Sequence, residues 1–372
     1  MTAQNSRPGP RLRRVALLIG HLEVGGTQKQ LALIALELRR AGVEVDVLTL
    51  SKGGPFEAPL RDGGVGVHHL GFARGAGAGN ARTFARMVGT LRRLRPDVLH
   101  AFLYHGYLIG VPAARLAGVP VVVAGRRNES RLDLRHPWSA VLDRAVTRMT
   151  DHVVVNAVAL ARDAVSAGAH PDRLSVIYNG LPGAAFDPAE PEPVGTSLPV
   201  LACVARLSEE KGHRFLLDAL ALLARRGRPC TLVLAGDGPE RDRLERQAAV
   251  LGIDVRFLGS RTDSAGLLAR ADVVLLPSLT EGLSNSVMEA MAAGRPVVAT
   301  SVGGNPELLE GRGVLVPPSE PVALADGIGR LLDDPELAGR LASAGRAWAR
   351  KHFDTHVMVD EHVTLYRRLL EK

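Results

Sequence analysis

Residues 275–307 read LLPSLTEGLSNSVMEAMAAGRPVVATSVGGNPE. An apolar run ends at Pro277, a polar loop with Glu281 follows, residues 287–293 have a helical pattern, and a second apolar run begins at Val297. Short apolar runs that alternate with helical spacing are typical of a parallel sheet covered by helices on both faces. The stretch therefore predicts an α/β fold.

The same alternation continues along the whole chain. Strands are expected at 15–19, 43–50, 65–70, 98–101, 119–124, 153–155, 174–177, 200–204, 231–234, 255–258, 273–276, 297–299 and 314–316. Helices are expected at 28–40, 81–95, 107–117, 157–167, 212–224, 240–251, 264–269, 285–293, 322–332, 335–348 and 356–370. A chain of 372 residues exceeds the usual size of one domain, so the pattern predicts two α/β domains with Rossmann-like parallel sheets.

A proline-containing segment at 182–199 marks the expected linker. We place the first domain at residues 1–185 and the second at 186–352, and we expect a C-terminal helix within 353–372 to pack back on the first domain. Ligands of such folds bind at the carboxyl ends of the strands. The two parallel sheets are expected to face each other across a cleft that holds the site.

The composition excludes several classes of protein. The formal net charge is +7, yet no nucleic-acid-binding motif and no interleaving of aromatic and basic residues is present, so no nucleic acid partner is expected. Two cysteines, Cys203 and Cys230, are too few for a disulfide framework and lack paired ligands for zinc. Residues 1–10 are polar, and no apolar run of about 18 residues exists to span a membrane. A cytoplasmic protein is expected.

Two carboxylates flank the expected start of one helix. Glu281 lies in the loop before it, Ser284 or Asn285 is its expected N-cap, and Glu289 lies in its second turn. The N-terminus of a helix binds phosphate, whereas carboxylates are suited to accept hydrogen bonds from sugar or ribose hydroxyls. Glu289 lies in an apolar helix, where a buried carboxylate needs a partner. Taken alone, Glu289 could equally be a solvated helix residue.

Arg206 and Lys211 belong to the loop after the expected strand at 200–204. Two cations that converge on a loop before a helix would stabilise a diphosphate leaving group. The alternative is two surface charges on a turn. Only five of the 46 basic residues of the chain are lysine, which favours a specific role for Lys211.

The first half offers weaker signals. Gly25 and Gly26 follow the first strand and permit close approach of the backbone to a ligand, although an ordinary turn is the alternative. His100 ends a strand and His105 opens the next helix, and both are expected at the edge of the cleft. Either histidine could contact an acceptor or a sugar, and a structural role is equally open. His105 is the preferred candidate.

The stretch from Glu281 to Glu289 resembles the E-x7-E motif of retaining GT-B glycosyltransferases, in particular glycosyltransferase family 4. The glycine-rich loop at 303–307 and the loop at 236–241 are similar to loops of the same family. The resemblance covers nearly the whole chain and is most specific over 203–307.

The resemblance implies a role for each matching residue. Glu281 would contact hydroxyls of the transferred sugar, Glu289 the ribose, and Arg206 and Lys211 the phosphates of the donor. Gly25 and Gly26 match a loop near the phosphates and the acceptor. The further donor-binding positions implied are Gly238, Arg261, Gly282, Leu283, Ser284 and Asn285.

The chain departs from the family pattern at three positions. Ala205 replaces the usual glycine before Arg206, and Gln28 stands where a glutamate is common. Phe102 replaces the second of two histidines that family members often carry at this strand end. The last departure prevents a direct assignment of the active-site histidine.

The resemblance implies transfer of a sugar from a UDP- or GDP-sugar to a hydroxyl or amine acceptor, with retention of anomeric configuration, in polysaccharide, glycolipid or other glycoconjugate biosynthesis. The acceptor could be a glycan, a lipid-linked molecule or a small molecule. No cofactor and no metal is expected, because cations and helix dipoles can neutralise the phosphates. The alternatives are a nucleotide-sugar epimerase on the same fold and a non-catalytic nucleotide-sugar-binding module.

Arginines recur in two stretches of the first half. They are Arg74, Arg82, Arg86, Arg92, Arg93 and Arg95, and then Arg126, Arg127, Arg131 and Arg135, which Trp138 follows. Many enzymes of the resembled family use their first domain to sit on the inner membrane, and arginines favour anionic lipid by roughly 1 kcal/mol per charge near the surface. A reversible peripheral association at the inner membrane face is therefore one expectation. A solvated helix face is the alternative.

Overall fold

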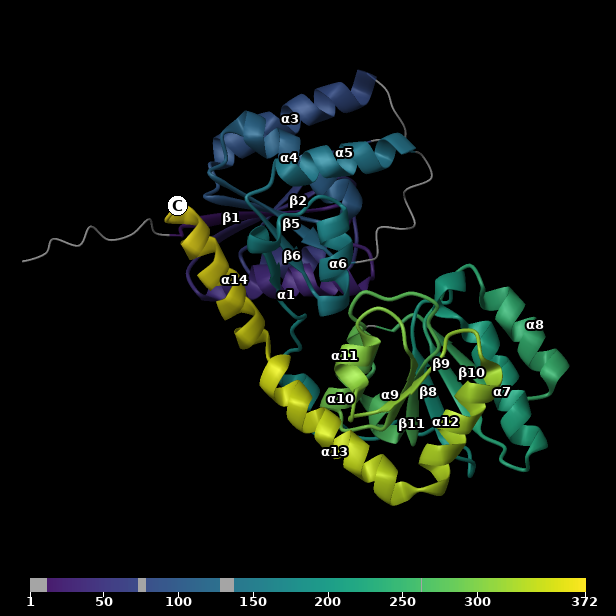
Figure 1. Cartoon of the computed structure of the whole chain (residues 1–372). Coiled ribbons are helices and arrows are strands. Elements are labelled where there is room, and N and C mark those ends of the chain that lie inside the picture. Colours follow the sequence, from purple (N-terminus) through teal and green to yellow (C-terminus); the bar gives the residue numbers. More distant parts are fainter. Residues whose placement is uncertain (1–11, 73–77, 128–136, 262) are drawn as a thin grey trace, which may run out of the picture. The chain divides into compact units, whose positions relative to one another are not determined.

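The computed structural model describes residues 12–72, 78–127, 137–261 and 263–372 (Figure 1). The chain forms two compact units, of which the first consists of Met1–Gly180 and Thr355–Lys372 and the second of Leu181–Asp354. Each unit contains one parallel β-sheet with helices on both faces. The predicted α/β class with two Rossmann-like sheets is confirmed.

The sheet of the first unit has seven strands in the order β3-β2-β1-β4-β5-β6-β7. The strands are β1 (Arg14–Ile19), β2 (Glu44–Thr49), β3 (Gly66–His69), β4 (Val98–Phe102), β5 (Val121–Arg126), β6 (His152–Val155) and β7 (Leu174–Val176). The helices are α1 (Gly26–Arg40), α2 (Glu57–Asp62), α3 (Ala78–Leu94), α4 (Leu103–Ala117), α5 (Pro137–Arg148), α6 (Val158–Ser166) and α14 (Thr355–Leu370).

The sheet of the second unit has six strands in the order β10-β9-β8-β11-β12-β13. The strands are β8 (Val200–Val204), β9 (Thr231–Ala235), β10 (Asp254–Gly259), β11 (Val273–Leu276), β12 (Val297–Thr300) and β13 (Val314–Val316). The helices are α7 (His213–Arg225), α8 (Arg241–Leu251), α9 (Ala265–Arg270), α10 (Asn285–Ala292), α11 (Asn305–Leu309), α12 (Pro321–Asp333) and α13 (Pro335–His352).

Alternating side chains of each strand supply two separate cores. In β1, Leu17 and Ile19 pack with residues of α1 and α14, whereas Ala16 and Leu18 pack with residues of α3 and α4. This division follows from the period of two in a strand, which sends successive side chains to opposite faces. Both faces are apolar because helices cover both, which explains why the strands are continuous apolar runs in the sequence.

Each sheet has one position where the strand order reverses. In the first unit this switch point lies between β1 and β4, and in the second unit it lies between β8 and β11. The loops after the two strands lead to helices on opposite faces of the sheet, which leaves a crevice at the carboxyl ends. The loops after β8 and β11 are therefore the first place to look for a ligand site in the second unit.

The proline-containing segment after Gly180 is attached to the second unit. Phe186 is buried, and Arg346 donates a hydrogen bond to its carbonyl oxygen over 2.8 Å. Further along, the Glu192 amide donates to the Gly266 carbonyl oxygen over 2.9 Å. The C-terminal helix α14 belongs to the first unit, where Tyr366 is fully buried. Within the described residues, no helix combines the length and the apolar character needed to cross a membrane.

Candidate active site

The loops that follow β8 and β11 are joined by backbone contacts. The Leu279 amide donates to the Glu210 carbonyl oxygen over 2.8 Å. Gly212 has a φ of +65°, and a Cβ atom at this position would lie 2.2 Å from the Pro277 carbonyl oxygen. Only glycine combines this backbone conformation with so close an approach. Lys211 and Glu281 are thereby brought together at the switch point, although 70 residues separate them in the chain.

Lys211 and Glu281 form a partly buried ion pair. The Lys211 Nζ atom lies 2.5 Å from Glu281 Oε1, and the exposed fractions of the two side chains are 23% and 7%. Ser278 Oγ donates to the same carboxylate oxygen over 2.6 Å. A carboxylate buried to this degree requires such partners, because desolvation penalises an unpaired charge.

The N-terminus of α10 lies directly after Glu281. Ser284 is the N-cap, and its Oγ accepts a hydrogen bond from the Val287 amide over 3.3 Å, so the predicted capping by Ser284 is confirmed. Asn285 is the first helical residue, and the preceding Gly282 and Leu283 are buried. The half-buried Glu289 lies one turn further, where its Oε2 accepts a hydrogen bond from Ser264 Oγ over 3.1 Å.

Two glycine-containing loops, one after β12 and one after β9, pack against the loops that carry Glu281 and Lys211. Gly303, with a φ of +53°, would place a Cβ atom 2.0 Å from the Glu281 carbonyl oxygen, and the Gly304 amide donates to the Gly282 carbonyl oxygen over 2.7 Å. On the other side, a Cβ atom at Gly238 would lie 2.3 Å from the Leu207 carbonyl oxygen. The glycines therefore allow the loops after β9, β8, β11 and β12 to form one packed layer.

The two predicted arginines of this unit differ in their surroundings. Arg206 is exposed, and among the described residues none forms a hydrogen bond or ion pair with its guanidinium group. Arg261 pairs with Glu192 of the segment before β8, and this contact raises the pKa of Arg261. Arg206 is consequently available to an anion, whereas Arg261 already has an anionic partner.

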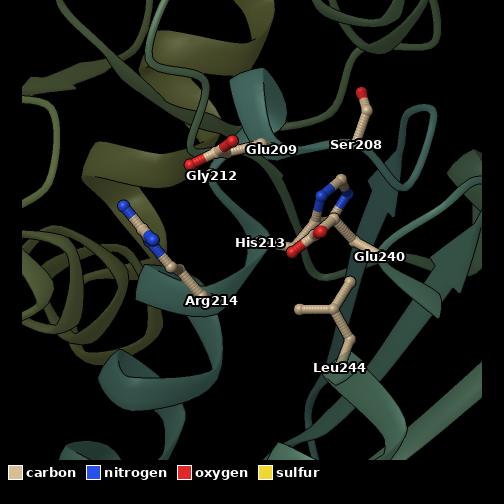
Figure 2. A pocket seen from close by; sticks show the side chains of 7 residues that line it. All are labelled: Ser208, Glu209, Gly212, His213, Arg214, Glu240 and Leu244. Carbon is tan, nitrogen blue, oxygen red and sulfur yellow. The ribbon is translucent and has the colours of Figure 1, made fainter. Parts of the chain in front are cut away.

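A small pocket lies at the start of α7, behind the loop that carries Lys211. Figure 2 shows its lining, which consists of Ser208, Glu209, Gly212, His213, Arg214, Glu240 and Leu244. The volume is about 10 Å³, which is close to the minimum for one water molecule. Burial lowers the pKa of His213 to about 4, so this histidine is neutral near pH 7. The pocket is too small for a nucleotide or a sugar.

In the first unit, the predicted glycines lie at the start of α1. Gly25 is the residue before the helix, and Gly26 is its first residue. A Cβ atom at Gly25 would lie 2.3 Å from Gln28 Oε1, so a larger residue would displace the end of this side chain. Gln28 is buried, and its Nε2 lies 3.4 Å from His21 Nδ1.

His105 is exposed in the first turn of α4. Leu103, the first residue of α4, has a φ of +63°, a conformation that non-glycine residues rarely adopt and that is often found near functional sites. Gly106 follows, and a Cβ atom there would lie 3.4 Å from the Leu18 carbonyl oxygen of β1. His105 is thus placed at the switch point of the first sheet.

The expectation that His100 lies at the edge of a cleft is wrong. Strand β4 continues to Phe102, and the His100 ring is fully buried. His100 Nδ1 lies 2.7 Å from the Tyr366 hydroxyl of α14, and the ring stacks on Phe102 with centroids 4.1 Å apart. Burial places the pKa of His100 well below its ordinary value. The side chain belongs to the core between the sheet and α14.

The expectation that the second basic stretch lies on the surface is wrong for Arg126 and Arg127. Arg126 is buried and donates to Asp143 Oδ1 over 2.8 Å and to Thr147 over 2.6 Å. Arg127 is buried, donates to Asn179 Oδ1, and lies over the Phe102 ring. Neither side chain can face a membrane. Arg74, Arg131 and Arg135 lie outside the described residues, as does the side chain of Trp138.

The first basic stretch is a surface feature. Arg82, Arg86, Arg92 and Arg93 of α3 and the following Arg95 are all exposed. Helix α3 contains no acidic residue.

Sequence reasoning missed Ser278, Thr300 and Asn305. They lie just after β11, at the end of β12 and at the start of α11, and hydrogen bonds connect them to Glu281. The signal available in the sequence was position, since Ser278 and Thr300 stand at the ends of apolar runs and Asn305 follows the glycine pair at 303–304. Among the described residues, no group of three or more histidine, cysteine, aspartate or glutamate residues is arranged to hold a metal ion.

Comparison with known proteins matches both units. The protein-family model "Glycosyl transferase 4-like domain" matches residues 25–180, and the family model "Glycosyl transferases group 1" matches residues 198–334. An alpha-D-kanosaminyltransferase of Streptomyces kanamyceticus is 30% identical in an alignment of 315 positions that covers 78% of this chain and 80% of the relative. A 2-deoxystreptamine glucosyltransferase of the same organism is 31% identical over 332 residues, with 78% and 82% covered.

A solved structure is similar over nearly the full length. The crystal structure of Anabaena Alr3699/HepE in complex with UDP superposes with a TM-score of 0.82 at 26% identity, and it covers 95% of this chain and 99% of that chain.

Proposed function

The chain belongs to the glycosyl transferases group 1 family and has the GT-B fold, and from this premise we propose that it transfers a sugar from a UDP- or GDP-sugar to an acceptor hydroxyl with retention of configuration. The observation that carries the proposal is the convergence of Lys211, Glu281 and the N-terminus of α10 on the switch point of the second sheet. The related structure that holds UDP supports a uridine nucleotide as the first donor to test.

The second unit would bind the donor. Arg206 and Lys211 would contact the diphosphate, because both cations lie on the loop after β8 and Arg206 is exposed. The backbone amides at the start of α10 would add further donors. Glu281 would accept hydrogen bonds from the transferred sugar, and Glu289 would do so from the ribose. Lys211 has three N–H groups, so it can keep its hydrogen bond to Glu281 and donate another to a phosphate at the same time.

The chemistry would rest on stabilisation of the leaving group. The bond between the anomeric carbon and the donor phosphate oxygen breaks, and the acceptor oxygen forms a bond to the anomeric carbon on the same face. The acceptor proton goes to the departing phosphate oxygen. Arg206, Lys211 and the helix dipole would stabilise the developing negative charge. We propose that these groups make the reaction independent of a metal.

The first unit would supply contacts to the acceptor. Gly25 and Gly26 allow close approach of the backbone at the start of α1, and the exposed His105 lies at the switch point of the same sheet. A polyhydroxylated acceptor fits these polar groups. The 2-deoxystreptamine named in one relative is a suitable first small molecule to test, beside glycan and lipid-linked extracts.

We also propose that the first unit associates reversibly with an anionic membrane from the cytoplasmic side. The support is the exposed arginine face of α3, which has no acidic residue. Flotation with vesicles of phosphatidylcholine and phosphatidylserine tests this at low and high salt. We expect binding at low ionic strength that salt abolishes. Absence of binding even at low salt would shift the acceptor toward a molecule that is free in solution.

One assay separates the candidate activities. The protein is incubated with UDP-glucose and with GDP-mannose, with and without acceptors, and with and without EDTA. Nucleotide release with a glycosylated product supports transfer, whereas an altered sugar on an intact donor would identify an epimerase. Nucleotide binding with neither product would identify a binding module. Loss of activity in EDTA with recovery in manganese or magnesium would contradict metal independence.

A further inference from the structure

A buried series of hydrogen bonds leads from α11 to the Glu281 carboxylate. Asn305 Nδ2 donates to the Thr300 carbonyl oxygen over 2.9 Å, and Thr300 Oγ1 donates to the Ser278 carbonyl oxygen over 2.6 Å. Ser278 Oγ then donates to Glu281 Oε1 over 2.6 Å. Ser278 and Asn305 are fully buried, and Thr300 is 2% exposed. The series therefore ties the ends of β11 and β12 to one carboxylate.

The hydrogen bonds to Glu281 are concentrated on one oxygen. Oε1 accepts from Ser278 Oγ and from Lys211 Nζ, whereas no described residue donates to Oε2. The terminal torsion of a glutamate has a broad energy profile, so a free carboxyl group rotates easily. The two donors to Oε1 hold the carboxyl group in one orientation and oppose this rotation. An ionised carboxylate accepts through both oxygens, which leaves Oε2 for a ligand.

We propose that Ser278 is a positioning residue for sugar transfer, whose hydroxyl holds Glu281 so that Oε2 meets a hydroxyl group of the transferred sugar. The inference rests on the proposed function, because it takes Glu281 as the residue that contacts the sugar. Thr300 supports Ser278 by fixing its carbonyl oxygen. Groups that are already oriented before the substrate arrives need no reorganisation during the reaction.

The test uses the full chain and a set of matched variants. Ser278→Ala removes the hydroxyl, Thr300→Val removes the next hydroxyl while keeping the shape, and Thr300→Ser keeps that hydroxyl. Thr231→Val is the control. Thr231 is a buried threonine of β9 in the same unit, and its hydroxyl lies 2.8 Å from Asp254 Oδ2, a partner outside the series.

The kinetic measurement compares turnover with nucleotide affinity. We expect Ser278→Ala to lower kcat for sugar transfer from UDP-glucose or GDP-mannose about ten- to hundred-fold, the range seen when a residue that orients a metal ligand is removed. The affinity for UDP or GDP should stay unchanged. Thr300→Val should give a smaller loss that Thr300→Ser restores, and Thr231→Val should leave kcat unchanged. Wild-type kcat in Ser278→Ala, or an equal loss of nucleotide affinity, would overturn the proposal.

A crystal structure of Ser278→Ala decides the point without any donor. We expect the backbone of the loops to be unchanged and the Glu281 carboxyl group to rotate or to take several orientations. A carboxyl group that keeps its wild-type position would overturn the inference. If the wild-type protein transfers sugar from neither donor to any of the acceptors, the proposed function fails, while this structure still shows whether Ser278 positions Glu281.

Discussion

The Nζ atom of Lys211 lies 2.5 Å from Oε1 of Glu281, so the cation assigned to the donor phosphates and the carboxylate assigned to the sugar form one ion pair. The pair is largely shielded from water, because Glu281 is 7% exposed and Lys211 is 23% exposed. Removal of either partner leaves the other with an uncompensated charge. Variants at the two positions consequently need measurements of stability as well as of ligand affinity.

Lys211→Ala and Arg206→Ala should both weaken the binding of nucleotide diphosphates. Loss of a charge-assisted hydrogen bond costs about 1.5–3 kcal/mol in affinity. Lys211→Ala should also lower the melting temperature, since Glu281 loses its counterion. Arg206→Ala should not, since the Arg206 side chain is exposed and forms no ion pair with a described residue. Calorimetry with UDP and GDP and thermal unfolding measure the two effects. Unchanged affinity in both variants would remove the phosphate assignment.

Glu281→Gln should abolish most transfer while free nucleotide still binds, because its proposed partner is the sugar. Glu289→Ala should weaken the binding of free nucleotide, because its proposed partner is the ribose. In the structure, Glu289 Oε2 accepts a hydrogen bond from Ser264 Oγ over 3.1 Å, which places the Glu289 carboxylate close to the start of α9. The measurements are kcat and calorimetric affinity for UDP and GDP. If Glu281→Gln lost nucleotide affinity as severely as Glu289→Ala, the two roles would be wrongly divided.

Gly303→Ala should impair the site through the backbone. A Cβ atom would lie 2.0 Å from the Glu281 carbonyl oxygen, and the φ of +53° disfavours any side chain. Strain in such a conformation costs about 1–3 kcal/mol, so we expect a lower melting temperature together with reduced turnover. Gly339→Ala is the matched control, because this exposed glycine of α13 has open space around it and alanine favours a helix. Equal melting temperatures for the two variants would contradict the role of Gly303.

Stability should decrease as the pH falls below about 6.5. Burial lowers the pKa of His362 from 6.5 to about 4 in the folded protein. The unfolded chain therefore takes up a proton at a higher pH than the folded chain does, and the stabilisation present above the unfolded pKa is lost as the pH falls toward 4. The slope for one histidine is at most about 1.4 kcal/mol per pH unit.

Thermal unfolding between pH 8 and pH 4.5 measures this dependence. His362→Gln should flatten the slope relative to that of the wild-type protein. The same slope in His362→Gln as in the wild type would show that other groups set the acid sensitivity.

Local patterns predicted the elements because the forces that select them act between near neighbours in the chain. The strands at 200–204 and 273–276 occur at the predicted residues. Ser284 was identified as a cap because a capping side chain bonds to an amide three residues later. The glycines of the loops at 236–238 and 303–304 were also identified from the sequence, because glycine often marks a turn or a close approach of the backbone.

Local patterns did not predict which individual polar side chains are buried. His100 was expected at a cleft edge, but α14 covers it through Tyr366, which is 266 positions away in the chain. Arg126 was expected on a basic surface, yet Asp143 of α5 holds it in the interior. A polar residue near a strand end looks the same in the sequence whether a distant helix covers it or not.

The amino-acid sequence by itself determined the two α/β units, the order of their elements and the identity of the Glu281 and Lys211 region. Periodicity and turn chemistry are local, so they can be read without coordinates. Only the tertiary structure placed Lys211 on Glu281, and only it joined Ser278, Thr300 and Asn305 to that pair. The physical reason is the strand order, because β8, β11 and β12 become neighbours through crossovers of many residues, and the side chains at their ends meet only after the sheet has formed.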